Sequence, residues 1–163
     1  MAGTALLRIP KAEIVLGQAA NYVASPTDTV ENVILTVPLP AIGGGDWALE
    51  LEALLSLTSS GNNKTIRWRA GGTGTDGTAF MAVVLTATAT YEDRRIIRNR
   101  SAAAFNVGFP AASGIGLGTS AGGVVSGTVD FSTAKNLYLT VQKATGAEVC
   151  DLQGYSVIYR PKP

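Results

Sequence analysis

The feature that most constrains this chain is an alternation of apolar and polar side chains between residues 46 and 58. In the run DWALELEALLSLT, apolar residues occupy the odd positions from Trp47 to Leu57, and Glu50 and Glu52 lie between them. A period of two places these apolar residues on one face of a β-strand. Leu, Glu and Ala also favour helices, but a helix would leave apolar residues on all sides. The pattern therefore predicts one long, half-buried strand.

A second alternating run, KTIRWRA at residues 64–70, follows the turn sequence SSGNN. Its apolar residues share one face, and Arg67 and Arg69 share the other. Because glycine, serine and asparagine favour turns, the two runs are predicted to pair as a β-hairpin. That pairing would set the two arginines beside Glu50 and Glu52 as a cross-strand ladder of opposite charges.

Shorter runs in which apolar and polar residues alternate continue along the chain, separated by glycine-rich connections. None of these runs has the period of an amphipathic helix. We therefore predict an all-β fold, an antiparallel β-sandwich of jelly-roll type with about eight strands. The run RRIIRNR at 94–100 carries charges on both sides of its apolar pair, which suits the edge of a sheet. The further predicted strands span residues 30–40, 80–91, 94–100, 124–132, 136–143 and 150–160.

The apolar faces of these strands predict the core. In the run 30–40, Val33, Leu35 and Val37 are predicted to share the inward face. The single cysteine, Cys150, cannot form an internal disulfide and is predicted to be a buried thiol. Burial is also predicted for the inward residues of the other strands: Trp47, Leu49, Leu51, Leu55, Ile66, Trp68, Leu85, Val129, Leu137, Leu139 and Val141.

The first 27 residues differ from the rest and are predicted to form an extended N-terminal arm, with the sandwich domain at 28–163. Pro10 and Pro26 interrupt a helix or a central strand. The arm holds too many apolar side chains for a free tail, so we expect it to lie on a neighbouring subunit. Its expected contact residues are Leu6, Leu7, Ile9, Ile14, Val15 and Leu16.

The low charge of the chain points to assembly. Charged residues make up 15% of the sequence, against about 25% in an average soluble domain. Such a surface is poorly suited to a soluble monomer, so a homo-oligomer is predicted, with a trimer as the favoured state. The net charge of +1 gives no field that would attract nucleic acid or an anionic membrane. No apolar stretch approaches the roughly 20 residues of a membrane span, and the start has no signal-peptide pattern.

The sequence contains no histidine, which excludes a Ser-His-Asp triad, a Cys-His pair and a His-ligated metal. The glycine-rich loop 108–123 includes GIGLG but lacks the strand-turn-helix context of a phosphate site. The loop is long for an ordinary connection, and it is therefore expected to touch a partner or to stay mobile. Glu50 and Glu52 stand roughly 7 Å apart on a strand face, as some glycosidase pairs do. The expected charge ladder is the favoured interpretation, so no enzyme, cofactor or metal is predicted.

Two further groups suit interfaces better than ligand sites. The only basic cluster lacks interleaved aromatic residues, so it favours edge protection or ion pairs with a neighbouring subunit over nucleic acid. Tyr138, Tyr155 and Tyr159 are candidates for sugar binding or for an interface. The basic cluster comprises Arg94, Arg95, Arg98 and Arg100.

From residue 46 to residue 160, the chain resembles a small β-sandwich found among the virion proteins of tailed bacteriophages. The resemblance lies in a leading W-x-L-x-L-x-A strand, a polar turn, a K-x-I-x-W strand, a Gly-Gly-Thr corner and a later strand ending in I-I-R. Here these elements are residues 47–53, 61–63, 64–68, 71–73 and 96–98. The resemblance implies a trimeric jelly roll with no catalytic residues.

The function that this resemblance implies is that of a cement or decoration protein, bound to the major capsid protein and stabilising the head shell. Such a protein would be made in the host cytoplasm and would end on the capsid surface of the virion. The alternative is a tail-fibre or head-spike domain that binds a host receptor or a glycan. A fibre knob would have exposed aromatic residues around a loop rim, and loop 108–123 offers only Phe109.

Overall fold

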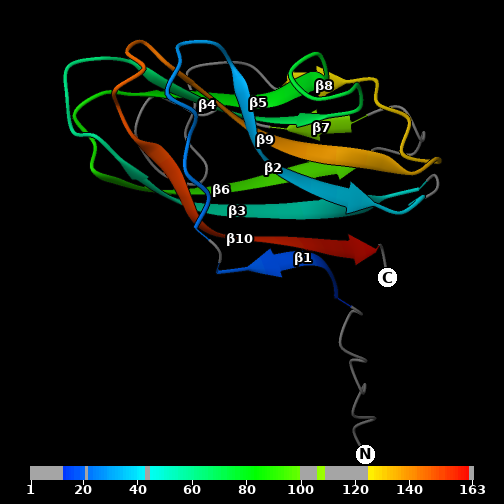
Figure 1. Ribbon diagram of the computed structural model, residues 1–163. Coiled ribbons are helices and arrows are strands. Elements are labelled where there is room, and N and C mark those ends of the chain that lie inside the picture. The colour runs from blue at the N-terminus through cyan, green and yellow to red at the C-terminus, as the bar shows by residue number, and fades with distance from the viewer. Residues whose placement is uncertain (1–12, 21, 43–44, 100–105, 109–124, 162–163) are drawn as a thin grey trace, which may run out of the picture.

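The computed structural model describes residues 13–20, 22–42, 45–99, 106–108 and 125–161. Within this part the chain forms strands and no helix, as Figure 1 shows. The prediction of an all-β antiparallel sandwich is confirmed, with ten strands where about eight were expected. The strands are β1 (Ile14–Ala19), β2 (Asn32–Leu39), β3 (Trp47–Leu57), β4 (Lys64–Ala70), β5 (Thr78–Leu85), β6 (Thr90–Asn99), β7 (Asn106–Gly108), β8 (Val125–Gly127), β9 (Lys135–Lys143) and β10 (Cys150–Pro161).

Two antiparallel sheets form the layers of the sandwich (Figure 1). The first sheet has the order β1-β10-β3-β6-β7-β8, and the second has the order β2-β9-β4-β5. Strand β1 pairs with β10, β2 with β9, β3 with β6 and β4 with β5. These nested pairs are what a chain doubled back on itself and rolled into two layers produces, which is the jelly-roll topology. The short hairpin β7–β8 extends the first sheet beyond β6.

The predicted hairpin between β3 and β4 is wrong. Strand β3 lies in the first sheet between β10 and β6, whereas β4 lies in the second sheet between β9 and β5. The turn between them carries the chain across the core from one layer to the other. Because both strands turn an apolar face to the same core, their alternation is identical whether the connection is a hairpin or a crossing. Only the partner strands decide between the two.

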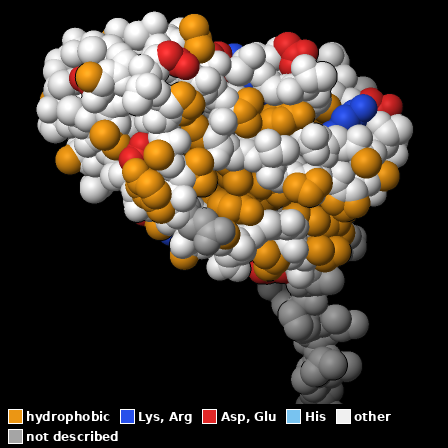
Figure 2. All heavy atoms as spheres, in the orientation of Figure 1, with side chains coloured by type: hydrophobic (Ala, Val, Ile, Leu, Met, Phe, Trp, Pro, Cys, Tyr) orange, Lys and Arg blue, Asp and Glu red, His pale blue; other side chains and the backbone are white. Residues whose placement is uncertain are grey.

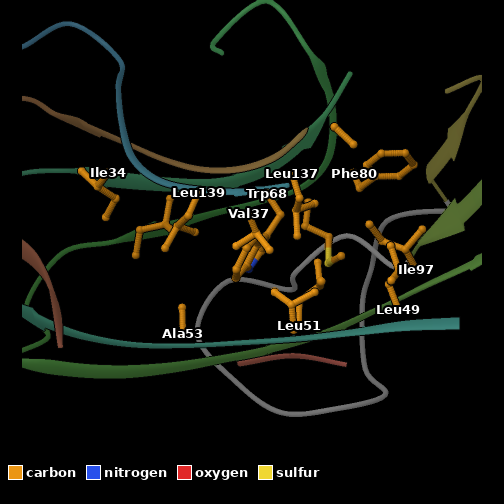
Figure 3. Close-up of a cluster of buried hydrophobic side chains, with 14 of the residues drawn as sticks. Ile34, Val37, Leu49, Leu51, Ala53, Trp68, Phe80, Ile97, Leu137 and Leu139 are labelled. Atoms are coloured by element: carbon orange, nitrogen blue, oxygen red, sulfur yellow. The ribbon is translucent and has the colours of Figure 1, made fainter. Parts of the chain in front are cut away.

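The core lies between the two sheets and is made of the residues that the alternation selected. All eleven residues predicted to be inward, from Trp47 to Val141, are buried, and so is Cys150. Figure 3 shows side chains of the first sheet, such as Leu49 and Leu51, pointing toward Trp68 and other side chains of the second. The Trp47 ring meets the Phe131 ring edge to face, with 5.1 Å between ring centroids.

Strand β2 departs from the predicted face because it contains a β-bulge. The pairing with β9 shifts between Val33 and Leu35, so an extra residue enters the strand at that point. As a result Ile34 is buried, Val33 is 38% exposed and Leu35 is half-buried. Val37, beyond the bulge, is buried as predicted.

Two strand boundaries also differ from those predicted. The run 80–91 is divided between β5, which ends at Leu85, and β6, which begins at Thr90. A tight turn separates them, in which the backbone N–H of Thr88 donates to the carbonyl of Thr86 at 2.8 Å. This turn contains no glycine or proline, so the composition did not mark it. Of the described residues 125–132 in the predicted run 124–132, only 125–127 are strand.

The boundary predicted at residue 27 does not separate an arm from the domain. Residues 14–19 form β1, which pairs with β10 of the same chain. Farther along, Val23 and Leu152 exchange two backbone hydrogen bonds of 2.9 and 3.0 Å. Residues 14–19 therefore find a pairing edge, that of β10, within their own chain, and they need no second subunit to form a strand. Residues 1–12 of the predicted arm lie outside the described residues.

Candidate functional site

Ion pairs hold the two glutamates of β3 on the outer face of the first sheet. Glu50 meets Arg160 of β10: Arg160 Nη2 donates to the carboxylate at 2.8 Å, and Arg160 Nε lies 2.6 Å from it. Glu52 lies 3.7 Å from Arg94 of β6, and Arg94 also contacts Glu92. A ladder of opposite charges therefore exists, but its arginines come from β10 and β6 rather than from β4. Both candidate carboxylates are therefore paired with arginines of the same chain.

The arginines of β4 have a different partner, Glu31, on the second sheet. Arg69 donates to the Glu31 carboxylate through Nε at 2.7 Å and through Nη2 at 3.0 Å, and Arg67 Nη1 lies 3.1 Å away. Thr140 donates its hydroxyl to the same carboxylate. Burial acts to raise the pKa of Glu31, but the hydrogen bonds of Arg69 and Thr140 and the charge of Arg67 hold it below its ordinary value.

A buried carboxylate, Asp93 of β6, joins the two sheets. It accepts a hydrogen bond from Trp68 Nε1 of β4 at 2.8 Å and another from the Tyr91 hydroxyl at 3.0 Å. Arg95 Nε lies 2.8 Å from the same carboxylate, and Arg95 also donates to the Tyr91 hydroxyl. Arg95, predicted to face a neighbouring subunit, is instead half-buried and bound within its own chain. Burial raises the pKa of Asp93, and Arg95 opposes that rise.

This raised pKa predicts an unusual dependence of stability on pH. The folded chain holds the Asp93 proton more tightly than the unfolded chain, so protonation of Asp93 stabilises the fold. That contribution is complete below the unfolded pKa of about 4 and is lost as the pH rises through the higher folded value. Compared with an Asp93→Asn variant, the natural chain is therefore expected to lose stability as the pH rises from about 4.

Urea unfolding of both chains at a series of pH values measures this difference. Asp130 offers a control of opposite sign, because hydrogen bonds from Ser132 lower its pKa. Compared with Asp130→Asn, the natural chain should gain stability as the pH rises toward the unfolded pKa of about 4, and should show little change above it. An Asp93→Asn comparison that is equally flat above about pH 4 would show that the fold does not raise the Asp93 pKa.

A second polar group closes one end of the sandwich, where residues 22–26 meet the start of β10. Asp151 accepts hydrogen bonds from the Tyr22 hydroxyl at 2.6 Å, the Ser25 backbone N–H at 2.7 Å and the Ser25 hydroxyl at 3.0 Å. Burial acts to raise the pKa of Asp151, but these hydrogen bonds and the charge of Lys143 keep it low. The carboxylate therefore stays charged and fastens the chain before β2 to β10.

Lys143, almost fully buried, supplies the matching cation. Its Nζ lies 3.3 Å from Ser25 Oγ, 2.7 Å from the carbonyl of Glu148 and 3.3 Å from the carbonyl of Gly146, and it also contacts the carbonyl of Pro26. A serine beside a lysine can form a nucleophilic pair when the amine is neutral. Here the ammonium has only three donors, all with acceptors nearby, and the Ser25 hydroxyl donates to Asp151. The arrangement is that of an anchor.

Two buried groups near Lys143, the Cys150 thiol and the Lys64 ammonium, also have a structural role. Burial raises the pKa of the Cys150 thiol to about 12, so the thiol stays protonated. Lys64 is fully buried; its Nζ donates to Ser60 Oγ at 3.0 Å and lies 3.5 Å from Glu148. Sequence reasoning missed both lysines, although each occupies an inward position: Lys64 leads to Ile66, and Lys143 continues from Val141. The alternation itself was the signal that could have found them.

The predicted interface residues of the first strand lie at the edge of the first sheet. Ile14 is 48% exposed and Val15 is 55% exposed, whereas Leu16 is half-buried and packs against the core. Within the described residues no strand pairs with the outer edge of β1. Hydrophobic side chains gather across the middle and lower part of the face shown in Figure 2, which has the orientation of Figure 1.

The remaining candidates divide into three groups. Arg94 and Arg98 are exposed on β6, next to Glu52 in the case of Arg94. Tyr138 is buried, and Tyr155 and Tyr159 are half-buried against the core, so none of these tyrosines is a free aromatic platform. The other predicted residues lie outside the described part of the chain: Leu6, Leu7, Ile9, Arg100 and residues 109–123 of the predicted loop 108–123, whose first residue ends β7.

The described residues contain no cluster of three or more His, Cys, Asp or Glu side chains that could hold a metal ion. No helix in that part of the chain is long and apolar enough to cross a membrane.

No protein-family model matches this chain, and no curated protein matches it. A search of solved structures found a match described as the structure of infectious bursal disease virus Gx strain. The match has 13% sequence identity and a TM-score of 0.28, and it covers 91% of this chain. The chain spans 40% of the length of that viral chain.

Proposed function

We propose that this chain is a structural subunit of a virion, and specifically a cement or decoration protein on the head of a tailed bacteriophage. The observation that carries the proposal is the nested pairing of β1 with β10, β2 with β9, β3 with β6 and β4 with β5. This jelly roll is the topology of many viral capsid domains, and also of lectins and cupins. Because one fold serves many functions, the choice among these classes of protein depends on the surface and on the polar groups.

The use of polar groups favours a structural role. Asp93, Asp151 and Lys143 are buried, and each bonds to other parts of the chain. The half-buried glutamates of β3 are matched by arginines. Inside the described part, these contacts fasten strands and loops together, which is what a shell-stabilising protein requires.

The proposed partners are further copies of the chain, with a trimer as the expected state, and the major capsid protein. The low charge of 15% supports burial of part of the surface in an assembly. The resemblance between residues 46 and 160 and phage virion sandwiches supports the capsid surface as the location. Neither nucleic acid nor a membrane is a proposed partner.

The alternative function is a fibre or head-spike domain that binds a receptor or glycan. The observation that favours it is a shallow pocket of about 260 Å³ on the first sheet. Leu54 and Tyr91 give this pocket apolar walls, and Glu92 and Gln153 give it polar groups. Apolar walls with a few polar groups are typical of small-ligand sites.

Electron microscopy of virus particles that carry a tagged version of this chain tests the proposal. A cement protein should decorate the icosahedral lattice in many copies, whereas a fibre or spike should lie at a single vertex. Binding to a glycan array that Leu54→Ala abolishes would favour the alternative. Absence of the tagged chain from purified particles would contradict both functions.

A further inference from the structure

We propose that the free edge of β1 accepts residues 5–9 of a second copy of this chain, which add to the first sheet as a further strand. This inference rests on the proposed function, because it supplies the contact through which copies of the subunit would associate. Addition of a strand to an exposed edge satisfies the backbone groups of both partners, and side-chain pockets give specificity.

Strand β1 lacks the usual protection of an edge. Its sequence, IVLGQA, contains no charged residue and no proline, the features that discourage pairing with other chains. The edge strand β2 of the other sheet carries Pro38. The edge strand β5 has the β7–β8 hairpin beside it, where Gly127 is so close that an added Cβ would lie 2.5 Å from the Phe80 ring. Strand β8, at the other edge of the first sheet, has three residues. Among the described edges, β1 is therefore the one best suited to accept a strand.

Exposed apolar side chains accompany this open edge. Ile14 is 48% exposed and Val15 is 55% exposed, at the start of the strand. Val15 is the register partner of Ile158 on β10, so the two share the outer face of the sheet. An added strand with apolar side chains would remove this surface from water, which favours association.

The segment before β1 has the composition of such a strand. Residues 1–12 read MAGTALLRIPKA and include Leu6, Leu7 and Ile9. A segment of 12 residues spans at most about 40 Å when extended, and a six-residue strand such as β1 spans about 20 Å. Residues 5–9 span about 17 Å as a strand, which is most of the length of a neighbouring β1, and residues 10–12 are left to link them to their own subunit.

The sequence that links this segment to β1 favours a second copy over the same chain. Glu13 contacts Arg160 of β10, so residues 10–12 are what remains for a turn back onto the same β1. Three-residue hairpin loops favour a glycine in the left-handed region, and Pro-Lys-Ala has none.

Charge complementarity points to the same occupant. The charged side chains within residues 1–12 are Arg8 and Lys11, both basic. Next to β1, the cluster Glu13–Arg160–Glu50 contains two carboxylates and one guanidinium. A basic segment approaching this edge would offset the excess negative charge.

The mass of the full-length chain in solution, measured by light scattering over a range of concentrations, tests the inference. Two changes should each weaken association by about tenfold or more: the triple change Leu6→Ser, Leu7→Ser and Ile9→Ser, and the single change Val15→Lys. Val84→Lys is the matched control, because Val84 is 45% exposed on the edge strand β5, and it should associate like the natural chain. Circular dichroism verifies that each variant is folded.

Hydrogen exchange of the β1 amides gives an independent readout. Their protection should increase with concentration in the natural chain and not in the triple variant. A natural chain that stays monomeric, or variants that all associate equally, would overturn the inference. A triple variant that loses β1 protection at every concentration without a change of mass would show that the segment folds onto its own chain. Failure of the proposed function appears separately, as absence from virus particles.

Discussion

Replacement of Trp68 by alanine is expected to lower the free energy of unfolding by about 3–5 kcal/mol. The indole is fully buried in β4 and belongs to the core between the sheets. Its removal leaves a large cavity and also deprives the buried Asp93 of the hydrogen bond from Trp68 Nε1. Urea unfolding followed by circular dichroism measures the change.

A second variant separates these two effects. Trp68→Phe keeps most of the ring but removes the N–H donor, so about 1–3 kcal/mol is expected for the unsatisfied carboxylate. Val84→Ala is the control, because Val84 is exposed on the neighbouring strand β5, and surface changes of this kind stay within about 0.5 kcal/mol. A loss below about 1 kcal/mol for Trp68→Ala would show that the two sheets do not pack as described.

The second large effect is expected for Lys143→Met, which keeps most of the unbranched side chain and removes its charged end. The Lys143 ammonium contacts the carbonyls of Pro26, Gly146 and Glu148. Hydrogen bonds to charged groups contribute about 1.5–3 kcal/mol each. The variant should therefore lose more than about 2 kcal/mol of unfolding free energy, because buried carbonyls are left without donors.

Local release of the chain before β2 gives this variant a distinct signature. Tyr22 is exposed, and its hydroxyl is held by Asp151 close to Lys143. Cleavage by chymotrypsin after Tyr22 should therefore be faster in Lys143→Met than in the natural chain. Lys135→Met is the control, since Lys135 is only half-buried at the start of β9. Equal cleavage rates and equal stabilities for the two variants would contradict the anchoring role of Lys143.

Both predictions concern contacts that close the sandwich rather than catalytic groups. Trp68 and Asp93 connect the two sheets, and Lys143 and Asp151 fasten the chain before β2 to the last strand. These contacts fit the structural role that we propose, and the proposed contact with further copies is at the exposed edge of β1.

The sequence by itself determined the all-β class, the position of most of the long strands and the buried face of β3, β4 and β9. Alternation is a local property, because successive side chains of a strand point to opposite faces. For this reason the inward positions of β3, β4 and β9 could be read correctly from the printed sequence. The same alternation held the signal for Lys64 and Lys143, which occupy inward positions that an apolar residue would ordinarily take.

Only the tertiary structure decided which strands are neighbours and therefore which charges meet. A hairpin and a crossing between layers present the same alternation, so β3 and β4 could not be assigned to different sheets from their own residues. The partners of Glu50 and Arg69 changed with that assignment. The bulge in β2 shifted Val33 outward by a register change that depends on β9. These features follow from long-range pairing, whose energy depends on segments distant in the chain and leaves no mark on local periodicity.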